Sequence, residues 1–279
     1  MLQNEFNYSG IPSINDFHSE TWKKLYTEMN QYQNKFLEKE NEFRSKKYIW
    51  TSDALNNWSR VWEYPYIYYQ LNKLMLEHNT GTKILDVGSG VTFFTTFLAE
   101  KGFDITATDI DPIAEKDLTK AIEVIKPQNG KANFKLCSED SLPFGDDEFD
   151  FVTSLSVIEH VNNLNKNISE IYRVLKPGGF FILTFDIDLG GEHELQPEKY
   201  NYFKNLLLNN FDLFLNYKIN HPSLYITNKN SIKPDPYYRK NINAKIKRIK
   251  NFIKKILGIS YFHPGHLTFE CVVLKKTNV

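Results

Sequence analysis

The chain has 279 residues with 34 basic and 34 acidic side chains, so its formal net charge is zero. This balance gives no overall attraction for nucleic acid or an anionic surface. The two cysteines, Cys137 and Cys271, form no CxxC pair, which argues against a disulfide scaffold or a cysteine-built zinc site. No secretion signal opens the chain, and no apolar stretch approaches the roughly 18 residues of a spanning helix, so we expect a cytoplasmic protein.

Residues 1–79 are polar and aromatic, with a mostly helical pattern. Segment 19–47 contains no Pro or Gly and predicts one or two exposed helices, and a further helix is predicted over 66–78, after Pro65. Segment 58–66 gathers an Arg, a Glu and four aromatic residues. These residues either supply an acceptor pocket or attach this N-terminal cap to the rest of the chain.

Residues 82–186 alternate short apolar strands with helical segments, which predicts right-handed parallel βαβ units. A helix near 198–210 and a strand near 211–217 continue this pattern. We therefore place one domain at 80–279, with 1–79 as a helical cap and an insertion at about 218–264. The predicted strands are 83–87, 105–108, 133–137, 149–154, 180–185 and 267–275, and the helices between them are 92–101, 112–125 and 165–175.

The first of these strands leads into Gly88-Ser89-Gly90 and then into a helix. Glycines permit a tight turn and the close approach of a ligand to the backbone, and the first N–H groups of a helix have no partner within it. A dinucleotide site needs a third glycine three positions later, where this chain has Phe93. A nicotinamide dehydrogenase is therefore disfavoured.

Two carboxylates accompany this turn. Asp86 stands inside the strand end, where it suits a positively charged ligand better than a diphosphate. Asp109 follows the turn by about 20 residues at the end of the next strand, where an acidic side chain accepts hydrogen bonds from ribose hydroxyls. A ligand with a ribose, a positive charge and no phosphate satisfies both positions.

Five blocks in this order resemble the successive motifs of class I S-adenosylmethionine-dependent methyltransferases of the small-molecule type. They are ILDVGSG at 84–90, TATDID at 106–111, SLPF at 141–144, FDFVTSLSVIEHV at 149–161 and RVLKPGGFFILT at 173–184. The resemblance covers residues 83–184. It implies a doubly wound, mostly parallel, seven-stranded α/β sheet with the Rossmann-like methyltransferase fold. The helical cap and a helical insertion before the last strand would be additions to it, and S-adenosyl-L-methionine would be the cofactor.

The resemblance also implies where the parts of this methyl donor bind. Many family members have an acidic residue that contacts the adenine amino group, and this chain has Ser138 there, followed by Glu139. The implied contacts are Asp86, Gly88, Ser89 and Gly90 with the methionine half, Asp109 with the ribose, Ile110, Ser138 and Glu139 with the adenine, and Ser154 and Ser156 beneath the methyl group.

Methyl transfer to oxygen or nitrogen requires a positioned acceptor and a base that takes its proton. His193, after the fifth strand, and His160, after the fourth, are the candidate bases, with His263 and His266 as further candidates. A cation site is the alternative role for the acidic loop after the fifth strand, but its spacing matches no fixed metal motif and we predict none. The residues of that loop are Asp186, Asp188, His193 and Glu194.

Segment 239–255 holds eight basic residues, no acidic ones, and isoleucines at helical spacing. Such a helix suits an anionic membrane surface, a phosphorylated carrier or RNA, or it packs its isoleucines on the domain.

We expect methylation of a small-molecule acceptor, with a hydroxyl of a sugar or secondary metabolite favoured. The alternatives are methylation of RNA or a lipid-linked substrate, and a non-catalytic cofactor-binding partner subunit. The Asn/Asp-Pro-Pro-Tyr motif of amino-methylating nucleic-acid enzymes is missing after the fourth strand, so no DNA partner is expected.

Overall fold

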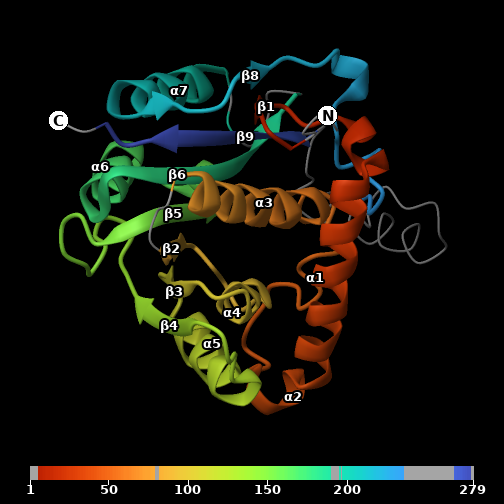
Figure 1. The fold of residues 1–279 in the computed structure, drawn as a ribbon, viewed down its shortest axis with the longest axis vertical. Coiled ribbons are helices and arrows are strands. Elements are labelled where there is room, and N and C mark those ends of the chain that lie inside the picture. Colours follow the sequence, from red (N-terminus) through yellow and green to blue (C-terminus); the bar gives the residue numbers. More distant parts are fainter. Residues whose placement is uncertain (1–5, 79–81, 190–194, 196, 236–266, 278–279) are drawn as a thin grey trace, which may run out of the picture.

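A computed structural model describes residues 6–78, 82–189, 195, 197–235 and 267–277. Within these ranges a single sheet has nine strands in the order β4-β3-β2-β5-β6-β9-β1-β8, with β7 also paired to β9 (Figure 1). The strands are β1 Ser9–Gly10, β2 Lys83–Val87, β3 Asp104–Asp109, β4 Lys131–Leu136, β5 Phe149–Leu155, β6 Leu175–Asp188, β7 Asp212–Leu213, β8 Tyr217–Lys218 and β9 Leu267–Lys275.

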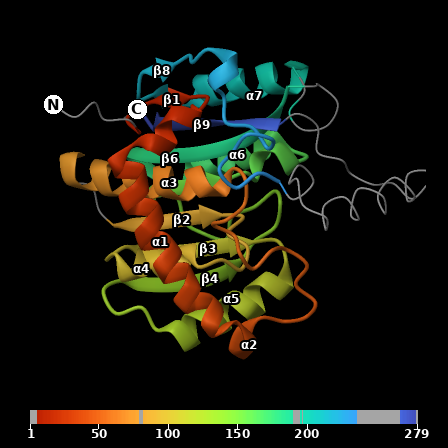
Figure 2. The same cartoon turned by 90° about the vertical axis from the view of Figure 1, so that its right-hand side faces the viewer.

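Helices cover both faces of the sheet, and α1 crosses the strand direction along one side (Figures 1 and 2). None of the described helices combines the length and the hydropathy that a membrane crossing requires. The first face carries α1 Glu20–Glu38, α2 Glu40–Phe43, α3 Arg60–His78, α4 Phe94–Glu100 and α5 Pro112–Ile125, and the second carries α6 Leu164–Val174 and α7 Pro197–Asn210. The described residues also form three short 3-10 turns: η1 Ile14–His18, η2 Ile158–His160 and η3 Pro222–Leu224.

Side chains along each strand point alternately to the two faces of the sheet, so the core has one part on each face. Ile84 and Phe180 pack with the α3–α5 side, whereas their neighbours Leu85 and Phe181 pack with the α6–α7 side. Strands β4, β3, β2, β5 and β6 are parallel, and β9 runs antiparallel to β6. The chain order reverses between β2 and β5, and ligands of open α/β sheets bind beyond the carboxyl ends of the strands at such a point.

The doubly wound α/β prediction is confirmed, and short strands extend the sheet beyond the seven expected. The N-terminal zone contributes β1, in which Gly10 pairs with Cys271 of β9. The strand predicted near 211–217 is divided into β7 and β8. Part of the predicted insertion, residues 219–235, lies against the N-terminal zone, where the Ser231 hydroxyl donates to the Trp58 carbonyl at 2.7 Å. The division of the chain at 79/80 remains a prediction, and segment 239–255 lies outside the described residues.

The prediction that α3 begins after Pro65 was wrong, because the helix begins at Arg60 and contains this proline. A proline within a helix removes the N–H that would bond to the carbonyl four residues earlier, here that of Val61. The indole N–H of Trp22, in α1, donates to the Val61 oxygen at 3.0 Å. A donor from a neighbouring helix therefore replaces the bond that the proline removes, which local sequence rules could not foresee.

This replacement predicts that the effect of Trp22→Phe depends on residue 65. In the native chain the substitution leaves a buried carbonyl without this donor, which costs about 1–3 kcal/mol beyond the change in packing. In a Pro65→Ala background the new alanine N–H supplies the missing helical bond, so Trp22→Phe should be milder by about that amount. Urea unfolding of the four proteins measures the difference, and equal losses in both backgrounds would contradict the assignment.

Candidate active site

The glycine turn after β2 has the geometry that only glycine adopts easily. Gly88 has φ +73° and Gly90 has φ +55°, both in the left-handed region. A Cβ on Gly88 would lie 2.5 Å from the Val157 side chain, and one on Gly90 would lie 2.6 Å from the Tyr48 hydroxyl. The Gly88 N–H donates to the Thr108 carbonyl of β3 at 2.9 Å, which fixes the turn against the neighbouring strand.

Asp109 joins the end of β3 to this turn. Its Oδ2 accepts the Gly90 N–H at 3.0 Å, and its Oδ1 accepts the Asp111 N–H at 3.1 Å. The next residue, Ile110, is 61% exposed although it is apolar. The carboxylate and the exposed apolar side chain therefore lie side by side at the strand end, as a ribose contact and an adenine contact would require.

Asp86 is buried beneath the turn. Its Oδ1 accepts the hydroxyl of Thr153, on β5, at 2.7 Å. Burial raises the pKa of Asp86 to about 7, the Thr153 hydrogen bond opposes this rise, and Arg60 opposes it further. A positive charge near Asp86 would favour its ionised form, so this carboxyl can respond to a cationic ligand.

A buried ion pair from the first turn of α3 reaches the end of β5. Arg60 Nη1 lies 2.5 Å from Glu63 Oε2 and also donates to the Ser156 hydroxyl, which in turn donates to Glu63 Oε1 at 2.8 Å. Glu63 is fully buried, and Ser156 has φ +44°. Ser154 also lies here, with its hydroxyl oxygen buried and without a hydrogen-bond partner in the described part of the chain. Both predicted serines thus lie at this edge, and Ser156 is joined to the cap.

Segment 58–66 attaches the N-terminal cap to the sheet, which is one of the two roles considered for it; an acceptor pocket there remains a prediction. Trp62 stacks on Tyr66 with ring centroids 4.7 Å apart and contacts Phe269 of β9 at 5.5 Å. These aromatic rings attach the cap to the sheet, because all three are fully buried. Arg60 and Glu63, from the same segment, instead reach the strand ends where the candidate site lies.

Residues 44–48, after α2, cover the glycine turn, which the sequence did not reveal. The Val91 N–H donates to the Tyr48 hydroxyl at 2.8 Å, and Arg44 Nη2 donates to the Val91 carbonyl at 2.9 Å. The Arg44 guanidinium also lies 5.1 Å from the centre of the Tyr48 ring. Neither residue belongs to a spaced motif, so only the fold brings them to the site.

The segment after β5 turns Glu159 inward and His160 outward. Glu159 is 4% exposed, and its Oε1 accepts the Asp186 N–H at 3.0 Å, whereas His160 is exposed. A catalytic role for His160 remains a prediction. His193 lies outside the described residues, as do Glu194, His263 and His266. Among the residues that are described, no group of three or more His, Cys, Asp or Glu side chains could hold a metal ion.

The predicted adenine contacts after β4 lie in a loop that is tied to the segment after η2. Ser138 is exposed and pairs through its backbone with Ser141. The Glu139 carboxylate accepts the Asn162 N–H at 2.6 Å and its side-chain amide at 3.1 Å, and these bonds lower the pKa of Glu139. The structure therefore shows Glu139 holding two loops together, and its adenine contact stays a prediction.

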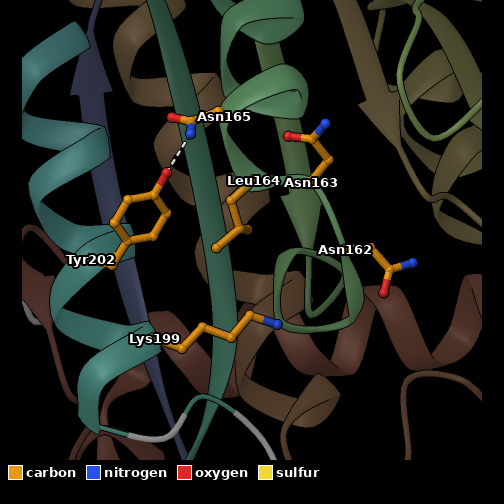
Figure 3. Close-up of a pocket in the computed structure, with 6 residues that line it drawn as sticks. All are labelled: Asn162, Asn163, Leu164, Asn165, Lys199 and Tyr202. Atoms are coloured by element: carbon orange, nitrogen blue, oxygen red, sulfur yellow. Dashed lines mark hydrogen bonds between the residues drawn. The ribbon is translucent and has the colours of Figure 1, made fainter.

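A surface hollow of about 560 Å³ lies next to η2, between the starts of α6 and α7 (Figure 3). Lys199 Nζ, on α7, donates to the Glu159 carbonyl at 3.0 Å, so a residue that lines the hollow contacts the segment after β5. The glycine turn contributes nothing to the walls, so this hollow is separate from the predicted donor site. The lining residues are Asn162, Asn163, Leu164, Asn165, Lys199 and Tyr202.

Comparisons with known proteins place this site in a family. Residues 85–183 match the model of a methyltransferase domain. The chain is 31% identical over 190 residues to a mitochondrial ubiquinone biosynthesis O-methyltransferase of Rattus norvegicus, with 63% of this chain and 53% of the relative covered. It is 37% identical over 134 residues to the ubiquinone/menaquinone biosynthesis C-methyltransferase UbiE of Rickettsia felis, with 46% and 50% covered.

Among solved structures, the [4+2]-cyclase SpnF shares the fold with a TM-score of 0.55 at 15% identity, covering 97% of this chain and all of that one. The chain spans about half the length of the curated relatives it matches. The matched segment contains the glycine turn, Asp86, Asp109 and the end of β5, and the sheet has the mostly parallel order of a Rossmann-like methyltransferase fold. Over residues 85–183, the chain therefore resembles a methyltransferase domain.

Proposed function

We propose that this chain transfers a methyl group from S-adenosylmethionine to a small-molecule acceptor, most favourably to a hydroxyl. The observation that carries the proposal is the hydrogen bond from the Gly90 N–H to Asp109 Oδ2, which joins the carboxylate at the end of β3 to the glycine turn after β2. In this arrangement Asp109 would hold the ribose hydroxyls. Gly88, Ser89 and Gly90 would admit the methionine half beside Asp86.

The charges of the site fit a cationic donor. Glu63, Asp86 and Glu159 are buried carboxyls around the single guanidinium of Arg60. In their ionised forms these carboxyls would repel a diphosphate, whereas they would stabilise a sulfonium. The two glycines are needed for the turn itself, since a Cβ on Gly88 would collide with Val157 and one on Gly90 with the Tyr48 hydroxyl.

S-adenosylmethionine supplies an activated methyl group when bound, and the residues of the chain position the acceptor and manage its proton. In-line displacement gains mainly from orientation, which the rigid strand ends β2, β5 and β6 can provide. An oxygen acceptor also gives up a proton, for which His160 and His193 are the bases predicted from the sequence.

The acceptor atom and the acceptor itself are parts of the proposal. One relative is named as an O-methyltransferase and another as a C-methyltransferase, so their names do not select between oxygen and carbon. Because a protein named as a [4+2]-cyclase shares this fold, methyl transfer has to be measured directly. Two further ideas depend on the basic segment 239–255, which lies outside the described residues. They are binding to a membrane surface or phosphorylated carrier, and methylation of RNA or a lipid-linked substrate.

Calorimetric titration with S-adenosylmethionine and S-adenosylhomocysteine is the first test. We expect both to bind with micromolar affinity, as about −8 kcal/mol of binding free energy would give. Methyl-labelled donor is then incubated with hydroxylated metabolites and quinol precursors, and the position of the methyl group in the product is read by NMR. A chain that binds neither ligand would contradict the proposal, and methylated carbon in the product would replace the hydroxyl as the acceptor.

A further inference from the structure

Glu159 is a buried carboxyl at the sheet edge where the candidate site lies. Its Oε1 accepts the Asp186 N–H at the end of β6, whereas its Oε2 is buried without a hydrogen-bond partner among the described residues. Burial raises the pKa of Glu159 to about 8, and the Asp186 hydrogen bond only partly opposes this rise. Near neutral pH the side chain therefore carries its proton.

The charged groups that face Glu159 come from three elements. From α3, Arg60 favours its ionised form and Glu63 opposes it, and the charge of Arg60 is already shared with Glu63 at 2.5 Å. From α7, the Lys199 ammonium bonds to the backbone carbonyl of Glu159 at 3.0 Å. From β6, Asp186 donates its backbone N–H to Glu159, and the Asp186 carboxylate raises the pKa of Arg60.

Arg60 also connects Glu159 to the donor side of the site, because it lowers the pKa of Asp86 as well. Carboxyls from the ends of β2 and β5 thus share one guanidinium, and that guanidinium is itself paired with Glu63. A second positive charge placed among these groups would be stabilised by ionisation of a neutral carboxyl. The donor's sulfonium is such a charge, and the product thioether is not.

We propose that Glu159 releases its proton when the positively charged donor binds, and that the resulting carboxylate accepts the proton of the acceptor. The proposal rests on the function proposed above. In the transfer, the acceptor oxygen forms the new bond to the methyl carbon while the carbon–sulfur bond breaks and its electron pair stays on sulfur. The acceptor's proton passes to the Glu159 carboxylate, which becomes neutral as the positive charge on sulfur disappears.

Proton counting by calorimetry tests this without a known acceptor. The full chain is titrated with S-adenosylmethionine and with S-adenosylhomocysteine in buffers of different ionisation enthalpy, which gives the number of protons released by each ligand. At about pH 7.5 we expect the cationic ligand to release more protons than the neutral one. Because the pKa of Glu159 is near 8, affinity for S-adenosylmethionine relative to S-adenosylhomocysteine should rise with pH and level off above that value.

Two substitutions test whether Glu159 is the group that releases the proton. Glu159→Gln keeps an oxygen for the Asp186 N–H but cannot ionise, so the difference in proton release should shrink while S-adenosylhomocysteine binds as in the unmodified chain. Glu77→Gln makes the same chemical change at a side chain that is 51% exposed in the last turns of α3, and should change nothing. Infrared difference spectra of the unmodified chain give a second reading. The protonated-carboxyl band should disappear with S-adenosylmethionine and persist with S-adenosylhomocysteine.

Equal proton release by the two ligands would overturn the proposal. A Glu159→Gln protein that keeps the full difference would overturn it too, and would assign the proton to another group such as Asp86. If that variant does not fold, the infrared spectra of the unmodified chain decide, and an unchanged carboxyl band contradicts the proposal. Absence of binding by both ligands would instead contradict the proposed function, so the two failures are distinguishable.

Discussion

Asp109→Ala is expected to weaken S-adenosylhomocysteine binding by about a hundredfold, which corresponds to about 3 kcal/mol. The carboxylate accepts the N–H groups of Gly90 and Asp111 and would also accept the ribose hydroxyls. Hydrogen bonds to a charged group contribute about 1.5–3 kcal/mol each, so losing the ribose contacts and loosening the turn together gives this magnitude. Calorimetry of the purified variant measures the loss.

Asp104→Ala is the matched control, because Asp104 begins the same strand at the opposite end of the sheet and its backbone N–H bonds to Thr82. This control should bind S-adenosylhomocysteine as the unmodified chain does. If Asp109→Ala also retained full affinity, the carboxylate would not belong to the donor site. Thermal melts of both variants separate a lost contact from a lost fold.

Arg60→Met is expected to destabilise the protein by about 3–5 kcal/mol, because it leaves a fully buried carboxylate without its cation. Among the described residues, Glu63 would keep only the Ser156 hydroxyl, which donates to its Oε1 at 2.8 Å. The reverse change, Glu63→Leu, should be milder, since the Arg60 side chain is 22% exposed and can be partly hydrated. Urea unfolding measures both free energies.

The double variant Arg60→Met with Glu63→Leu distinguishes a lost ion pair from lost packing. Replacing both partners with apolar side chains of similar size removes the unpaired charge, so we expect most of the stability to return. The affinity of the double variant for S-adenosylhomocysteine should nevertheless stay below that of the unmodified chain, because Arg60 lowers the pKa of Asp86. Additive losses in the double variant would show that the pair stabilises the fold through packing alone.

The strands and the glycine turn could be predicted from the sequence because their determinants are local. Apolar runs such as 83–87 recur at regular intervals, and Pro112 at the start of α5, capped by Asp111, marks that helix. Gly88 and Gly90 indicate their own backbone geometry, since left-handed φ values favour glycine. The proposed donor half of the site was predicted from these local signals.

The remaining parts of the site depend on contacts between distant segments. The Tyr48 hydroxyl meets the Val91 N–H across 43 positions, and Arg60 meets Ser156 across 96. Whether Glu159 or His160 faces inward depends on the orientation of one short turn, η2, against β6. No spacing rule encodes that orientation, so the more familiar base, histidine, was favoured from the sequence.

The pairing of β1 with β9 has a consequence for how the protein matures. The thiol of Cys271 donates to the carbonyl of Gly10 at 3.2 Å, which joins positions 261 residues apart. Domains begin to fold as they leave the ribosome, but this closure waits until β9 has been synthesised. Contacts of such long range are also slow to form, because the entropy of closing the loop is lost before the contact is gained. The segment that contains β1 is therefore secured in the sheet long after it has been synthesised.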